Sequence, residues 1–223
     1  FSSRRRHTRY ADRSRGLGDV YKRQERISID GKPIRRPRRE TKVRTLIYHK
    51  PAGEICSRSD PQGRPTIFAS LPRVLGARWI TVGRLDYQTT GLLIVTTDGE
   101  LANRLMHPSS ELKREYAVRA LGELSDEQLQ RLLQGVELED GPARFDDIAV
   151  TNDDGANRSY RVVVSEGRNR IVRRMFERVG CRVNRLMRVS YGPLSLPRSL
   201  RPGKYRELDD KEAALLYKAV SQS

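Results

Sequence analysis

The segment between residues 79 and 99 constrains the fold more than any other part of the chain. Two apolar runs, residues 79–82 and 92–95, flank a polar loop that contains two glycines. Short apolar runs bounded by glycine are typical of buried strands. The loop is therefore predicted to connect two strands of a core sheet, and it carries a single carboxylate, Asp86, two residues after Arg84.

Asp86 has two interpretations on spacing alone. An Asp in a glycine-containing loop commonly forms the turn itself, because its side chain accepts hydrogen bonds from nearby backbone N–H groups. An Asp beside an arginine, on a loop between buried strands, can instead stay ionised and point at a ligand. A pattern this short does not decide between the two.

A basic composition accompanies this loop. The 223 residues include 44 Lys or Arg and 28 Asp or Glu, which gives a net charge of +16. Residues 1–24 carry eight of the basic and two of the acidic residues, which leaves 36 and 26, or +10, for the other 199 residues. A sustained excess of this size favours a nucleic acid partner over a merely solvated basic surface.

The sequence lacks the signals of several other classes of protein. Cys56 and Cys181 form no CxxC pair and the three histidines have no metal-ligand spacing, so neither a disulfide framework nor a metal site is expected. No apolar run approaches the roughly 20 residues of a membrane span. We expect a cytoplasmic protein with reduced thiols and no membrane contact.

Five motifs occur in order between residues 43 and 208. They are KPAG at 50–53, GRLD at 83–86, KREYAVRA at 113–120, EGRNRIVRRM at 166–175, and LMRV at 186–189 with Gly192. Together they resemble the motifs of the RNA pseudouridine synthases, in the branch that modifies single uridines of bacterial ribosomal RNA. Ile171 departs from the pattern, which usually has Gln or Glu at that place.

The resemblance implies a fold and an activity. The fold is α+β, a pseudouridine synthase fold with one long, mixed but mainly antiparallel sheet in two halves, flanking helices and a central cleft. The activity moves the ribose bond of a uridine from N1 to C5 without a redox step, so no cofactor is expected. Residues 60–66 and 138–143 are most similar to members acting on large-subunit (23S) rRNA, and the expected substrate is an unpaired or weakly paired uridine, bound by a monomer.

The same resemblance implies the roles of individual residues. Asp86 is the catalytic carboxylate, Tyr116 stacks on the target uracil, and Arg173 is the cation beside Asp86. An arginine suits that position because it stays charged and can grip a carboxylate with two hydrogen bonds. The residues implied to bind substrate are Arg84, Lys50, Arg168, Arg170 and Leu186.

The N-terminal part of the chain has a different character. Residues 1–24 show no hydrophobic period and no helix cap and resemble translated sequencing-adapter read-through, so they are expected to be non-native or a disordered basic arm. Residues 25–42 are expected to be a remnant of an S4 RNA-binding domain, its last hairpin, followed by a basic linker; the helical front of that domain is absent. Residues 43–223 are expected to form the catalytic domain.

Periodicity within the catalytic region predicts its main elements. Ser125 and Gln128 form a capping box before one helix, and Gly180 ends another. The predicted strands are 43–48, 116–121, 145–150, 160–165 and 185–191; the predicted helices are 99–106, 125–134, 169–179 and 209–219. The predicted inward residues of the last two helices are Ile171, Val172, Met175 and Phe176, and Ala213, Leu216 and Tyr217.

Other interpretations stay open beside a large-subunit rRNA enzyme. The chain could be a synthase for another rRNA site, or a basic, ribosome-associated RNA-binding protein without catalysis. From the residues alone, Tyr116 and Leu186 could also be packing residues of a sheet, and Arg173 one of several arginines on a helix surface.

Overall fold

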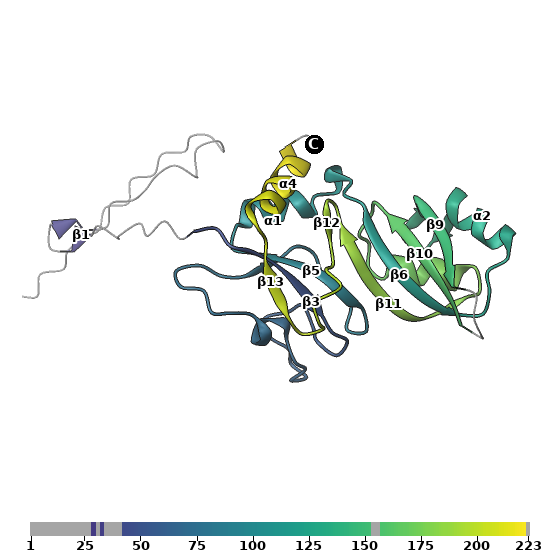
Figure 1. Cartoon of the computed structure of the whole chain (residues 1–223), viewed down its shortest axis with the longest axis horizontal. Coiled ribbons are helices and arrows are strands. Elements are labelled where there is room, and N and C mark those ends of the chain that lie inside the picture. The colour runs from purple at the N-terminus through teal and green to yellow at the C-terminus, as the bar shows by residue number, and fades with distance from the viewer. Residues whose placement is uncertain (1–27, 30–31, 34–41, 153–156, 222–223) are drawn as a thin grey trace, which may run out of the picture. The chain divides into compact units, whose positions relative to one another are not determined.

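The structure, a computed structural model, describes residues 28–29, 32–33, 42–152 and 157–221 (Figure 1). The chain divides into two compact units, Phe1–Glu40 and Thr41–Ser223. In the first unit, β1 (Ser28–Ile29) and β2 (Lys32–Pro33) form an antiparallel pair where a hairpin was predicted. Residues 1–24, and the predicted linker apart from residue 42, lie outside the described residues.

The second unit is built on a nine-stranded sheet of mixed, mainly antiparallel strands. The strand order is β13-β3-β5-β11-β6-β10-β9, with β4 paired to β5 and β12 paired to β11. All pairs are antiparallel except β5 with β11, which run parallel. Every predicted strand is present, displaced by up to three residues at its ends. The strands are β3 (Thr45–Lys50), β4 (Ile80–Thr81), β5 (Thr90–Thr96), β6 (Arg114–Leu121), β9 (Asp147–Asn152), β10 (Asn157–Val164), β11 (Arg182–Tyr191), β12 (Leu194–Ser195) and β13 (Tyr205–Glu207).

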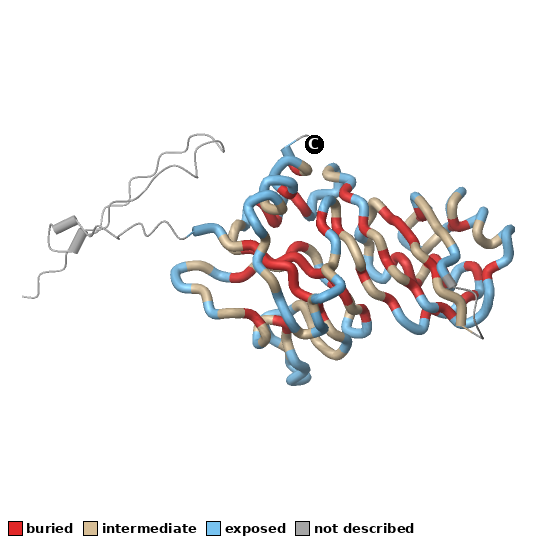
Figure 2. The backbone as a smooth tube through the Cα atoms, in the orientation of Figure 1, coloured by how far each residue is buried: buried red, intermediate tan, exposed pale blue. Residues whose placement is uncertain are grey.

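The parallel pair divides the sheet into two halves. In the first half (β13, β3, β4 and β5), the two central strands β3 and β5 are buried on both faces (Figure 2). On one face Leu93 packs in a core with the short 3-10 helix η1 (Ile67–Ser70). On the other, Leu92 packs in a core with α1 (Gly99–Met106) and α4 (Asp210–Ser221). Strands covered on both faces have continuous apolar runs, which explains the run at residues 92–95.

The second half (β11, β6, β10, β9 and β12) has one buried face. Buried residues of β6 alternate with partly or fully exposed ones, as expected for a sheet with one solvent face. Helix α3 (Ile171–Arg178) covers the buried face, where the ring of Phe176 lies 5.6 Å from that of Tyr160. A small hairpin of β7 (Val136–Leu138) and β8 (Gly141–Ala143) lies against α3.

Two helices have the boundaries that their capping residues predict. Helix α1 spans residues 99–106, and the Asp98 side chain accepts hydrogen bonds from the backbone of its first turn. Helix α2 (Asp126–Gln134) begins after Ser125, whose hydroxyl accepts from the backbone N–H of Gln128 while the Gln128 side chain accepts from the backbone N–H of Ser125. This reciprocal pair is the predicted capping box.

The other two helices differ from the prediction in detail. Helix α3 begins at Ile171, two residues later than predicted, because Arg170 has a left-handed φ of 50° that no α-helix accommodates. Helix α4 buries Leu216 as predicted, but Tyr217 is 40% exposed. The inward placement of Tyr217 was wrong: its hydroxyl donates to the carboxylate of Asp98, which keeps the ring at the surface.

Candidate active site

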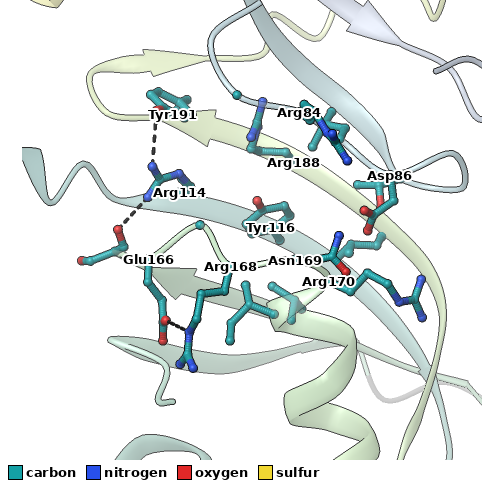
Figure 3. Close-up of a pocket in the computed structure, with 18 of the residues that line it drawn as sticks. Arg84, Asp86, Arg114, Tyr116, Glu166, Arg168, Asn169, Arg170, Arg188 and Tyr191 are labelled. Carbon is teal, nitrogen blue, oxygen red and sulfur yellow. Dashed lines mark hydrogen bonds and ion pairs between the residues drawn. The ribbon is translucent and has the colours of Figure 1, made fainter. Parts of the chain in front are cut away.

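A pocket of about 940 Å³ lies where the two halves of the sheet meet (Figure 3). One wall is the loop between β4 and β5; the other consists of β6, β11 and the loop that leads into α3. The arginines outnumber the carboxylates, which suits an anionic ligand. The charged lining residues are Arg84, Arg114, Arg144, Arg168, Arg170 and Arg188, with Asp86, Glu111, Asp146 and Glu166.

Asp86 lies in a tight turn just before β5. The backbone N–H of Thr89 donates to the Asp86 carbonyl at 3.0 Å, and the Thr89 hydroxyl lies 3.5 Å from the Asp86 carboxylate. The side chain is half-buried, and within the described residues no cation forms an ion pair with it. The carboxylate is therefore available to a ligand in the pocket.

Lys50 stabilises this turn through hydrogen bonds to its backbone. Its ammonium group donates to the backbone carbonyls of Pro51, Asp86, Tyr87 and Thr89 at distances of 2.9 to 3.4 Å. The side chain is 0% exposed and does not line the pocket, and burial lowers the pKa of Lys50. Lys50 was expected to contact substrate, but its donors are already used by the turn. In this structure Lys50 therefore positions the turn and does not reach the pocket.

Arg173 lies on the buried side of α3. It is 7% exposed, its Nη1 donates to the carbonyl of Val183 at 2.8 Å, and its Nε and Nη2 are buried without a partner. The expected two-bond grip on Asp86 is not formed: of the ion pairs between described residues, none joins the two. Burial and then the charge of Arg170 lower the pKa of Arg173, whereas the charge of Asp86 acts in the opposite direction. The two groups are therefore close enough to interact electrostatically.

Tyr116 and Leu186 are brought together by adjacent strands. Side chains alternate along a strand, so Arg114, Tyr116 and Val118 share one face of β6. Val118 packs in the core beneath α3. Tyr116 belongs to the same core and also lines the pocket, and Arg114 lines the pocket. Leu186 is the cross-strand neighbour of Val118 on β11 and also lines the pocket. The buried face of the second half thus changes from apolar to polar as it passes the end of α3.

Three residues of this wall were absent from our prediction: Arg114, Arg188 and Tyr191. A β-bulge follows Arg188, and it allows Arg188 and Tyr191, three positions apart, to lie on the same face. The guanidinium carbons of Arg114 and Arg188 lie 4.9 and 5.1 Å from the centre of the Tyr191 ring. Strand periodicity could have found both arginines, since each lies two residues from a predicted site residue, Tyr116 or Leu186.

The remaining predicted arginines line the pocket but differ in how many of their donors are already used within the protein (Figure 3). Arg84 and Arg170 are exposed, and Arg170 forms an ion pair of 3.6 Å with Glu177. Arg168 forms ion pairs with Asp140 and Glu166 and also donates to backbone carbonyls of the β7–β8 hairpin. Most of its donors are used within the protein, so Arg168 ties the hairpin to the loop before α3 and has little left for a ligand.

Among the described residues, no group of three or more His, Cys, Asp or Glu side chains is arranged to hold a metal ion. Within the same residues, no helix has the length and apolar character needed to cross a bilayer.

Residues 44–178 match the RNA pseudouridylate synthase family. The chain belongs to this family. It is 55% identical over 206 residues to ribosomal large subunit pseudouridine synthase B of Pseudomonas aeruginosa, covering 92% of this chain and 53% of that protein. It is 56% identical over 185 residues to the protein of the same name from Escherichia coli K12, covering 82% of this chain and 64% of that protein. The chain thus spans between about half and two thirds of the length of these relatives.

Solved structures agree with the family in fold. A crystal structure of a pseudouridylate synthase superposes with a TM-score of 0.70 at 30% identity, covering 79% of this chain and 74% of that chain. A chain in an H/ACA RNP bound to a substrate RNA superposes with a TM-score of 0.53 at 18% identity, covering 71% of this chain and 50% of that chain. The expected α+β pseudouridine synthase fold is confirmed.

Proposed function

We propose that this chain converts one uridine of large-subunit (23S) ribosomal RNA to pseudouridine. The observation that carries the proposal is the pocket between the sheet halves, in which Asp86, without an ion pair to any described residue, shares an arginine-rich lining with Tyr116. The choice of large-subunit RNA is supported by the names of the relatives, which are more than half identical to this chain.

Asp86 is the proposed catalytic carboxylate. A half-buried carboxylate held by its own backbone turn is oriented before substrate arrives, which favours chemistry at a bound ribose. Either attack on the sugar or removal of a proton from it fits this position. No external cofactor enters the reaction, since the bond that is broken and the bond that is formed belong to the same nucleotide.

Arg173 is the proposed counter-charge of Asp86. Its burial without a carboxylate partner among the described residues, and its electrostatic interaction with Asp86, support this role.

Tyr116 and Leu186 are the proposed walls for the uracil ring. Both are largely buried and both line the pocket, so a base inserted between the sheet halves would contact their apolar surfaces. Stacking on an aromatic side chain contributes about 1–3 kcal/mol per base. This gain would offset part of the few kcal/mol needed to extrude a base from its RNA stack.

Arg84 and Arg170 are proposed to hold the RNA backbone at the rim, because both are exposed and carry charge beside the pocket.

We place the catalytic domain at residues 43–223 and an S4 remnant at 25–42, a division supported by the boundary between Glu40 and Thr41. We propose a cytoplasmic monomer; the free thiols of Cys56 and Cys181 are in keeping with a reducing compartment.

The direct test is to incubate the full chain with fragments of large- and small-subunit rRNA and to map pseudouridine in each. We expect product at one unpaired or weakly paired uridine of the large-subunit RNA. Asp86→Asn should lower turnover by more than about a thousandfold, within the range for essential catalytic groups, with an unchanged melting temperature.

Three outcomes would contradict the proposal. Substantial turnover by Asp86→Asn would remove Asp86 from the chemistry. Product confined to small-subunit RNA would move the target to another rRNA site. Tight RNA binding without product from any fragment would indicate a non-catalytic RNA-binding protein.

A further inference from the structure

Arg188 carries a buried positive charge that no described residue of the chain neutralises. The residue is 2% exposed, and within the described part of the chain no carboxylate forms an ion pair with it. Its Nε donates to the carbonyl of Leu92 at 2.8 Å, but its Nη2 is buried without an acceptor. Buried donors are rarely left unpaired, and an unpaired buried charge is costly. We therefore expect a bound ligand to supply the missing hydrogen-bond acceptor.

Arg188 lies next to residues of two other strands that flank the pocket. It is the cross-strand neighbour of Tyr116 on β6 and lines the same pocket. Its Nε donates to the carbonyl of Leu92 on β5, next to Gly91, which pairs with Arg188. Arg188 therefore contacts β5, the strand that follows the Asp86 turn, and lies on β11 opposite Tyr116 of β6.

The guanidinium is also held in a fixed orientation. The ring of Tyr191 lies 5.1 Å from the guanidinium carbon of Arg188, and the Tyr191 hydroxyl donates to the carbonyl of Leu105 at 2.7 Å. The ring is therefore anchored to α1 while it supports the arginine. A donor that is oriented before the ligand arrives needs no reorganisation when charge develops next to it.

We propose, on the basis of the proposed function, that Arg188 donates a hydrogen bond to a carbonyl oxygen of the target uracil. Arg84 and Arg170 are exposed at the rim, where the RNA backbone remains. Arg188 lines the pocket although the residue is only 2% exposed, so a ligand group must enter the pocket to contact it. A flat base inserted beside Tyr116 enters the pocket, whereas a backbone phosphate stays outside. This role differs from that of Arg173, a residue of α3 that is the proposed counter-charge of Asp86.

The chemistry gives this hydrogen bond a catalytic effect. When the bond between N1 of uracil and C1′ of ribose breaks, its electron pair stays on the ring, and the negative charge spreads over N1 and the carbonyl oxygens. C5 then bonds to C1′ and loses its proton, and N1 gains one, so atoms and electrons balance without an oxidant or reductant. A cationic donor at a carbonyl oxygen stabilises the charged ring more than the neutral one.

The test compares two RNA stem-loops that differ only at the target, one with uridine and one with an abasic ribose. All proteins carry Asp86→Asn, so that the uridine is not converted during the binding measurement. We expect Arg188→Gln to weaken binding of the uridine RNA by about tenfold, the effect of a hydrogen bond to a charged group, and to leave the affinity for the abasic RNA unchanged. The matched control is Arg144→Gln, an exposed pocket arginine, which should weaken both RNAs equally.

The ratio of the two affinities does not depend on how much of a variant is folded, so loss of stability in Arg188→Gln does not obscure the result. Equal weakening for both RNAs would show that the contribution of Arg188 does not depend on the base and would overturn the proposal. Equal affinity of the Arg188-containing protein for both RNAs would also overturn it. Absence of turnover by the native chain, with the base-dependent ratio intact, would instead refute the proposed function alone.

Turnover gives an independent readout in the protein with Asp86 intact. We expect Arg188→Gln to lower kcat by about a hundredfold, the usual effect of losing one donor to developing charge. Arg188→Lys should recover part of kcat, because it keeps the charge but not the planar fork. Full kcat in Arg188→Gln would exclude the catalytic effect.

Discussion

The two halves of the sheet differ in how they are buried, and the difference explains what each contributes to the pocket. Neighbouring residues of β5, such as Leu92 and Leu93, pack in opposite cores. Along β6 only alternate residues are buried, and Arg119 is exposed between Val118 and Ala120. A strand covered on both faces has no surface for a ligand, so the first half contributes a loop at a strand end. The second half contributes side chains from the strands themselves.

The difference also separates the chemical roles in the pocket. The first half carries Asp86 on a turn that Lys50 fixes through backbone carbonyls. The second half carries Tyr116 and most of the pocket arginines, on a buried face that is apolar at Val118 and polar at Arg114. Asp86 and the strand residues that face it are thus supplied by structures that can be perturbed separately.

The largest effect is expected from shortening core side chains in the two halves. Leu92→Ala and Leu93→Ala should each lower the free energy of unfolding by about 2–5 kcal/mol, because each leaves a cavity in a different core. In β6, Val118→Ala should cost about 1–3 kcal/mol, whereas Arg119→Ala should stay within about 0.5 kcal/mol. Urea unfolding measures all four, and a small effect of either leucine variant would contradict burial on both faces.

The next effect concerns Gly91, where the two halves meet. A Cβ atom there would overlap the backbone carbonyl oxygen of Arg188 and lie 2.7 Å from the backbone nitrogen of the same residue, and φ is +104°. Gly91→Ala should therefore cost about 3 kcal/mol or more through strain and steric overlap. Gly203 has a φ of +76°, and a Cβ atom added to it would meet no other atom within 4 Å, so Gly203→Ala should cost only about 1 kcal/mol. Equal losses of thermal stability would show that close approach of the strands is unimportant.

Local signals predicted the elements of this fold well. The capping box at Ser125 and Gln128 set the start of α2, and the apolar run at residues 92–95 identified a buried strand. Both depend on residues close together in the sequence, where hydrogen-bonding geometry and side-chain period decide the outcome. The motif resemblance then supplied the arrangement of these elements and the family, which local patterns do not contain.

Features that depend on distant contacts were not predictable in this way. Lys50 was expected at the substrate, but the carbonyls that bind it belong to the distant turn at Asp86. Strand spacing from Leu186 could have placed Arg188 at the pocket, but its contacts with Tyr116 and Leu92 come from other strands and could not be predicted from that spacing. Helical spacing predicts an inward position for Tyr217. The ring lies at the surface because its hydroxyl donates to Asp98, a residue 119 positions away in the sequence.

The smallest effect is expected at the edge of the first half, where Arg206 on β13 forms two hydrogen bonds of 2.6 and 2.7 Å with the carboxylate of Glu212 on α4. Arg206 is the main cause of a lowered pKa of Glu212. A carboxylate whose pKa is lower in the folded than in the unfolded state contributes stability above its unfolded pKa of about 4.3. That contribution is lost as the pH falls through the lower, folded pKa.

Glu212→Gln should therefore melt below the native chain by at most about 3 °C near neutral pH, since exposed ion pairs contribute little. The difference should stay constant down to about pH 5 and shrink below about pH 4. Arg206→Gln is the matched control and should give the same pH dependence, because it removes the other partner of the pair. A difference that grows on acidification would mean that Glu212 is protonated more readily in the folded chain, and that α4 covers the first half by apolar packing alone.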